Sequence, residues 1–230
     1  MAYVTALGID IDDNSMLSVT FQISIPSSGS DSGSSQSSKT QNTTVQCSTI
    51  DSGISLVNSY ISKQINLSHC KVVVFSEKIA AQGLNDYIDT LANNIEIRPN
   101  CNVIISRCDA KTFIEKSTPS IETLTARYYE VALKSSEYTG YTTTTEFADF
   151  VNNLKNTFIQ ATAILGGVNT GENNISNRPY VGIDSSYKAD ETPISDVNNV
   201  ETFGTAVFCA DKFVGELNRI WNNLFLVNKQ

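Results

Sequence analysis

Four consecutive apolar residues at positions 72–75, VVVF, place the strongest constraint on how this chain folds. Alternate side chains of a strand point to opposite faces, so an unbroken apolar run must be covered on both faces. One helical stripe precedes the run at 48–65, and another follows Ser76, which we expect to cap it. A second short run, Val103–Ile105, leads into a helix that Asp109 is expected to cap. Strands that alternate with helices predict a sheet with parallel neighbours.

The amino-terminal segment predicts a β-hairpin followed by a loop. Residues 17–25 alternate apolar and polar side chains, as a half-buried strand does, and the apolar segment 3–9 is expected to pair with them. The acidic turn at 10–14 resembles a calcium loop superficially, but the spacing and the closing Glu are missing. Residues 26–42 are rich in Ser and Gly and therefore predict a loop.

A break at Ser117-Thr118-Pro119 predicts a boundary between two domains. The first, over 1–116, is an α/β domain with the order ββαβαβ. The second, over 117–230, is an α+β domain for which we expect helices at 120–135 and 145–155, a capping box of Thr143 and Glu146, strands at 158–165, 204–208 and 213–217, and mostly loop at 166–200. The class is thus α+β or mixed α/β, each domain being a small mixed sheet with packed helices.

Charge and hydropathy argue against two kinds of partner. The formal net charge is −8 and no Lys/Arg cluster offsets it, which disfavours nucleic acid and anionic lipid. No apolar run approaches the roughly 20 residues that span a bilayer. The start of the chain has neither the basic region nor the cleavage site of a signal peptide.

The only histidine, His69, stands directly before Cys70, which raises the question of an enzyme or a metal site. Neighbouring side chains of a strand point apart, so the two cannot act as nucleophile and base while 68–75 is extended. One His with scattered Cys also disfavours zinc. A Cys–His hydrolase would need another thiol at His69, from Cys47, Cys101, Cys108 or Cys209. The five cysteines are interpreted mainly as core residues, with one disulfide left open.

The segment NNIEIRP, residues 93–99, directly precedes the second buried strand. Glu96 and Arg98 share one side of an extended segment, so we expect a salt bridge that pins the connection or, alternatively, an edge that contacts a partner. No GxGxxG, P-loop, GxSxG or HExxH motif is present. We therefore predict no catalytic residue, cofactor or metal.

Five segments occur in an order and spacing that resemble the Ger(x)C family. They are ALGID (6–10), VTFQISIP (19–26), SHCKVVVFSEKIAAQGL (68–84), NIEIRPNCNVIISRCDAKTFIE (94–115) and GTAVFCADKFVGEL (204–217), with the Ser/Gly-rich insertion after the second. This family comprises the C-subunit lipoproteins of nutrient germinant receptors in endospore-forming bacteria. The resemblance covers nearly the whole chain, and it rests on the order of the segments, since each alone is ordinary strand and turn sequence.

The resemblance implies a non-enzymatic receptor subunit that acts with two integral-membrane partners, the A and B subunits, in spore germination. It implies a lipid anchor on the outer face of the spore inner membrane and three domains, of which this chain matches two. We therefore expect a soluble fragment without the anchor and the third domain. His69, Glu96 and Arg98 lie in matching segments as candidate partner contacts, with no role assigned. The alternative is a secreted protein that binds a small ligand, or a Cys–His hydrolase.

Overall fold

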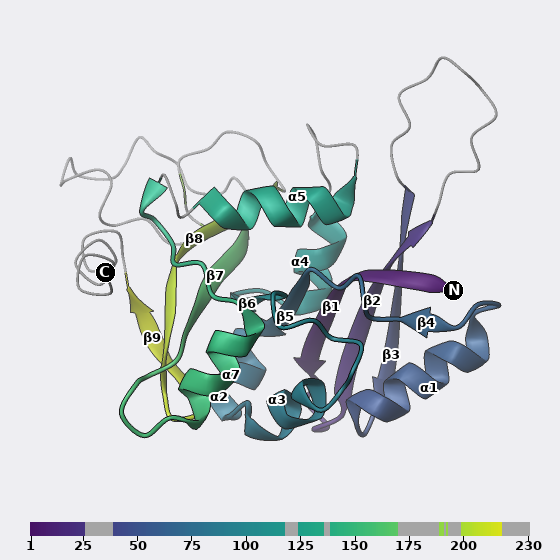
Figure 1. Cartoon of the computed structure of the whole chain (residues 1–230), viewed down its shortest axis with the longest axis horizontal. Coiled ribbons are helices and arrows are strands. Elements are labelled where there is room, and N and C mark those ends of the chain that lie inside the picture. Colours follow the sequence, from purple (N-terminus) through teal and green to yellow (C-terminus); the bar gives the residue numbers. More distant parts are fainter. Residues whose placement is uncertain are drawn as a thin grey trace, which may run out of the picture.

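The computed structural model describes residues 1–25, 39–117, 124–135, 139–169, 189–190, 192 and 199–217 (Figure 1). These residues form one mixed sheet of nine strands with helices on both faces. The strands are β1 Ala2–Ile11, β2 Leu17–Ile25, β3 Lys39–Cys47, β4 Ile65–Asn66, β5 Val72–Ser76, β6 Asn102–Ser106, β7 Thr162–Asn169, β8 Asn199–Cys209 and β9 Lys212–Leu217. The helices are α1 Ile50–Tyr60, α2 Glu77–Gln82, α3 Asn85–Ala92, α4 Ala110–Lys116, α5 Thr125–Ala132 and α7 Phe147–Lys155, with a 3-10 turn at Leu133–Ser135.

The sheet has a parallel centre and antiparallel flanks. Its strand order is β3-β2-β1-β5-β6-β7-β8-β9, with the short β4 paired to the start of β1. Strands β1, β5, β6 and β7 run parallel to one another, which confirms the parallel neighbours expected from the alternation of strands and helices. The β1–β2 and β8–β9 hairpins are also confirmed. The class, a mixed sheet with packed helices, is therefore as predicted.

Strand β5 is covered on both faces of the sheet, since all five of its residues are buried. Val73 and Phe75 pack with α1, α2, α3 and α7 on one face, whereas Val72 and Val74 pack with α4 and α5 on the other. Each side chain of this size that is fully buried stabilises the fold by about 1.5–3 kcal/mol. The run VVVF thus packs against the helices on both faces of the sheet.

The strands of both halves belong to one sheet, which corrects the expectation of two small sheets. Strand β7, from the second half, pairs in parallel with β6, so that Ile104 lies opposite Ile164. The division into two domains near residue 116 is not confirmed. Among the described residues, no helix is long and apolar enough to cross a membrane.

Strand β3 is the main element that the sequence did not predict. Residues 39–42 had been assigned to the Ser/Gly-rich loop, but they pair with β2 without a register shift. Its polar side chains, Thr, Asn and Gln, are mostly half-buried because β3 forms one edge of the sheet. Such an edge strand lacks the apolar alternation on which a strand prediction depends. Residues 26–38 lie outside the described residues.

Several helices differ from their predicted bounds in the first half. The helix expected over 48–65 ends at Tyr60, and Ile65 instead begins β4. The helix expected after Ser76 is split into α2 and α3 at Gly83, whose φ of 129° is left-handed. Ser76 does stand at the N-cap position, but its side chain makes no cap hydrogen bond.

In the second half, the predicted capping box is wrong. Helix α7 begins only at Phe147, and the Thr143 hydroxyl shares a hydrogen bond of 3.3 Å with Thr205 of β8. The helix expected at 120–135 is observed as α5 and the 3-10 turn, and the three strands as β7, β8 and β9 with shifted bounds. Some predicted segments lie outside the described residues. They are 118–123, 136–138, most of the loop predicted at 166–200 with its extended piece at 180–183, and the apolar segment 220–225.

Candidate functional site

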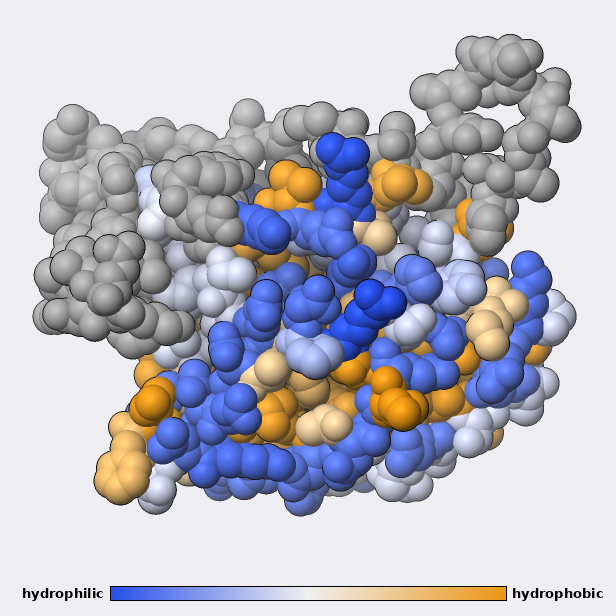
Figure 2. Space-filling model, in the orientation of Figure 1, coloured by the Kyte–Doolittle hydropathy of each residue, from blue (hydrophilic) through white to orange (hydrophobic). Residues whose placement is uncertain are grey.

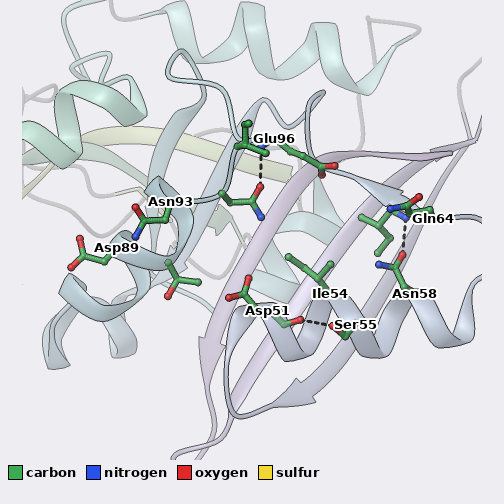
Figure 3. Close-up of a pocket in the computed structure, with 12 residues that line it drawn as sticks. Asp51, Ile54, Ser55, Asn58, Gln64, Asp89, Asn93 and Glu96 are labelled. Atoms are coloured by element: carbon green, nitrogen blue, oxygen red, sulfur yellow. Dashed lines mark hydrogen bonds between the residues drawn. The ribbon is translucent and has the colours of Figure 1, made fainter.

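A polar groove of about 720 Å³ lies between α1, α3 and the connection that follows α3 (Figure 3). Its floor includes the start of β4, at the amino ends of the parallel strands. The lining consists of Asp51, Ile54, Ser55, Asn58, Gln64, Ile65, Asp89, Thr90, Asn93, Asn94, Ile95 and Glu96. Three of these carry a carboxylate, and no lysine, arginine or histidine among the described residues lines the groove.

Helix α1 supplies one wall through a polar stripe beside its buried face. Asp51, Ile54, Ser55 and Asn58 follow the spacing i, i+3, i+4, i+7, which places them on one side of a helix. Figure 3 shows Asp51 and Ile54 directed from α1 toward α3. The core side of α1 approaches β3 closely, because a Cβ added at Gly53 would lie 2.9 Å from the sulfur of Cys47. The close packing of the core side fixes the direction of the polar stripe.

The floor is tied to α1 by Asn58, whose Oδ1 accepts a hydrogen bond of 2.8 Å from the backbone N–H of Ile65. On the opposite wall, Asp89 of α3 forms an ion pair of 2.5 Å with Lys155 of α7. Both side chains of this pair are about half exposed, so it contributes at most about 1 kcal/mol. Asp51 forms no ion pair among the described residues, and its side chain is exposed.

Glu96 is the most firmly held carboxylate of the groove. Its Oε2 accepts a hydrogen bond of 2.8 Å from the N–H of Leu67, and its Oε1 accepts one of 3.1 Å from the side chain of Asn66. Its own N–H donates to Asn94 over 3.0 Å, a contact drawn in Figure 3. Glu96 therefore joins the connection after α3 to the connection before β5.

The predicted pair of Glu96 with Arg98 is not formed. The segment is a series of turns rather than an extended strand, so alternate side chains do not share a side. Arg98 is exposed, and no ion pair joins it to Glu96 among the residues that the structure describes. The predicted salt bridge is therefore wrong, and Glu96 instead accepts hydrogen bonds from the backbone N–H of Leu67 and the side-chain amide of Asn66.

His69 lies outside the groove, in a turn before β5, and is exposed. Its ring contacts the ring of Tyr3 with 4.4 Å between centroids, and its Nδ1 is 3.1 Å from the Ser68 hydroxyl. The segment 68–71 is not part of the strand, which corrects the extended geometry assumed from the sequence. Cys70 is nevertheless buried and directed away, its thiol donating to the carbonyl of Val72 over 3.3 Å. No hydrogen bond joins His69 to a thiol in the described part of the chain.

Asp10 lies at the opposite, carboxyl end of the parallel strands and acts on α4. Its carboxylate accepts hydrogen bonds from the N–H groups of Ala110, at 2.7 Å, and Lys111, at 3.1 Å. Burial raises the pKa of Asp10, and these hydrogen bonds lower it by less. The sequence assigned this capping role to Asp109, which makes no cap hydrogen bond. The neighbouring turn is closed by Asp12 and holds no metal cluster among the described residues.

Most of the groove residues that the sequence missed lie on α1 and α3. Ile54 belongs to the apolar stripe of its helix and packs against the core, but it is half-buried and also lines the groove. The signal that could have found Asp51 and Asn58 is their helical spacing on one side of that stripe. No sequence signal could have found Asp89, because the residues that face it across the groove come from a different helix.

The two longest segments of the resemblance come close together at this site. Glu96, from the segment 94–115, bonds to the residue that precedes the segment 68–84. A scan against models of protein families matches residues 1–169 to the family described as "Spore germination protein N-terminal domain". Neither the comparison with curated proteins nor that with solved structures gave a match. The match covers most of the chain and runs from β1 through β7, so this chain belongs to the spore germination protein family whose N-terminal domain that model describes.

Proposed function

We propose that this chain is a non-enzymatic interaction domain of a germinant receptor C subunit, which acts with the integral-membrane A and B subunits in nutrient-triggered germination. The observation that carries the proposal is the family match over residues 1–169, which contains every residue of the groove. The proposal places the full-length protein on the outer face of the spore inner membrane, held there by a lipid anchor.

The chemistry of the groove supports an interaction role over catalysis. It contains fixed hydrogen-bond acceptors, but no histidine, cysteine or lysine lines it among the described residues. Its one hydroxyl on α1, Ser55, donates to the carbonyl of Asp51 over 3.0 Å, so no side-chain base activates it. A nucleophile needs such a base or a lowered pKa.

The lining also fits a protein partner better than a small ligand. Pockets for small ligands are lined mostly by apolar and aromatic side chains. Here the apolar lining residues are three isoleucines, of which Ile95 is 99% exposed. Figure 2 shows this face of the molecule as largely hydrophilic with small hydrophobic areas between. An exposed isoleucine beside unneutralised carboxylates suits a partner segment that carries a basic and an apolar side chain.

A charge reversal in the groove tests this proposal. Asp51 and Asp86 are both exposed aspartates in the first turn of a helix, α1 and α3 respectively, but only Asp51 lines the groove. Asp51→Lys and Asp86→Lys therefore change the helix ends alike. In spores that carry the full-length gene, we expect Asp51→Lys to lower co-purification of the membrane subunits several-fold and to slow nutrient germination.

The Asp86→Lys spores serve as the control and should match wild type in both measurements. If the two variants gave the same co-purification and the same germination rate, the groove would not be the surface that binds the partner. The wider proposal, a role in germination, is tested by deletion of the gene. Normal germination of the deletion strain with every nutrient tried, where no redundant receptor exists, would overturn it.

A further inference from the structure

Two buried thiols face each other at the amino end of the β5–β6 ladder. Cys70 and Cys101 are 31 positions apart in the sequence, and their sulfurs are 4.0 Å apart in the fold. Their exposed fractions are 2% and 1%. Both are free thiols in this structure, as are the other three cysteines. The family resemblance assigns no function to this pair of cysteines.

Backbone pairing brings the two cysteines together just before the first paired residues of β5 and β6. The N–H of Asn102 donates to the carbonyl of Lys71 over 2.8 Å, and Val72 lies opposite Asn102 in the parallel register. The two sulfurs are 4.0 Å apart, and a disulfide holds them at about 2 Å. The two sulfurs must therefore approach each other by about 2 Å for the bond to form.

We propose that Cys70 and Cys101 form a disulfide when the protein folds in an oxidising environment. The oxidant is a small-molecule disulfide such as oxidised glutathione. One cysteine thiolate attacks it and releases one reduced glutathione, and the second thiolate then attacks the mixed disulfide and releases another. The two thiols lose two electrons and two protons in total, and one oxidised glutathione becomes two reduced molecules.

The bond forms during folding or local opening rather than in the closed native state. Burial excludes the oxidant, and the contact with Cys70 together with burial raises the pKa of the Cys101 thiol, which makes its thiolate scarce. Once formed, the disulfide joins the two connections that Glu96 already joins by hydrogen bonds. Whether the bond forms does not depend on what the groove binds.

Peptide mapping tests the proposal directly. The whole chain is refolded from denaturant with a mixture of reduced and oxidised glutathione, and free thiols are alkylated before digestion with trypsin. We expect a disulfide between the peptide that ends at Lys71 and the peptide that ends at Arg107, with three of the five thiols alkylated. Five alkylated thiols, or Cys70 bonded to Cys47, Cys108 or Cys209, would overturn the proposal.

Thermal unfolding gives a second measurement on the same samples. A loop of this length predicts that the disulfide raises Tm by roughly 5 °C or more over the reduced protein. In Cys101→Ala the difference between oxidised and reduced samples should vanish. In Cys47→Ala, which removes another buried thiol, it should remain. Persistence of the difference in Cys101→Ala would contradict the assignment.

Discussion

Two carboxylates lie at opposite ends of the parallel strands. Both accept hydrogen bonds from N–H groups, but they serve different purposes. Asp10 accepts two backbone N–H groups of α4 and is buried, whereas Glu96 accepts one N–H and one amide and is half-buried in the groove. The lone pairs of Asp10 are taken up inside the fold. Those of Glu96 lie beside solvent, in a groove that also holds Asp51, a carboxylate without an ion pair among the described residues. We therefore interpret Asp10 as a folding residue and Glu96 as one that also serves the surface.

The difference teaches that accepting a backbone N–H does not by itself mark a functional carboxylate. Near Asp10, one pair of charges is closed within the chain, because Lys78 pairs with Asp13 over 2.6 Å. In the groove, Asp51 and Glu96 have no such pair among the described residues. The groove thus presents carboxylates that a basic side chain of a partner could pair.

The largest expected effect is that of Asp10→Ala. The change leaves two helix N–H groups, one buried and one partly buried, without an acceptor, so we expect a loss of about 2–4 kcal/mol in the free energy of unfolding. Denaturant unfolding followed by circular dichroism measures it. Asp109→Ala is the matched control, since that exposed side chain makes no cap hydrogen bond and its loss should cost less than about 0.5 kcal/mol. Equal losses in the two variants would refute the capping role of Asp10.

A smaller effect is expected for Glu96→Ala, about 1–2 kcal/mol, because its hydrogen bonds are only partly buried. Hydrogen exchange should rise most at the amide of Leu67, which donates to this carboxylate. Arg98→Ala serves as the control and should leave both stability and exchange at Leu67 unchanged. If Arg98→Ala instead reproduced the effect of Glu96→Ala, the salt bridge expected from the sequence would exist in solution.

The sequence predicted what depends on side-chain periodicity and missed what depends on contacts across the sheet. The run VVVF predicted a strand covered on both faces, and all of β5 is buried, because burial on two faces leaves a local signature. Strand β3 has no such signature, since its polar residues are held in a strand by their pairing with β2. Asp10 reaches α4 from 100 positions away, and no local pattern announces that contact. Glu96 was singled out by the sequence, but the partner predicted for it, Arg98, is wrong, because its real partners come from 29 and 30 positions away.

The pH dependence of stability separates the two influences on Asp10. Burial raises its pKa above the ordinary value of 3.8, and the hydrogen bonds from Ala110 and Lys111 oppose this shift. The native state therefore keeps the proton to higher pH than the unfolded chain does. The stability contributed by the protonated carboxyl is fully present below pH 3.8 and is lost as pH rises through the folded pKa.

Asp10→Asn removes this titration, so the stability of wild type relative to Asp10→Asn should fall as pH rises from below 3.8 toward neutrality. Denaturant unfolding of both proteins at a series of pH values measures the difference, in which all other titrating groups cancel. A difference that instead grew with pH would mean that the hydrogen bonds from α4 outweigh burial. The folded pKa of Asp10 would then lie below its ordinary value, and the carboxylate would be a stabilising charge, as a helix cap near the surface is.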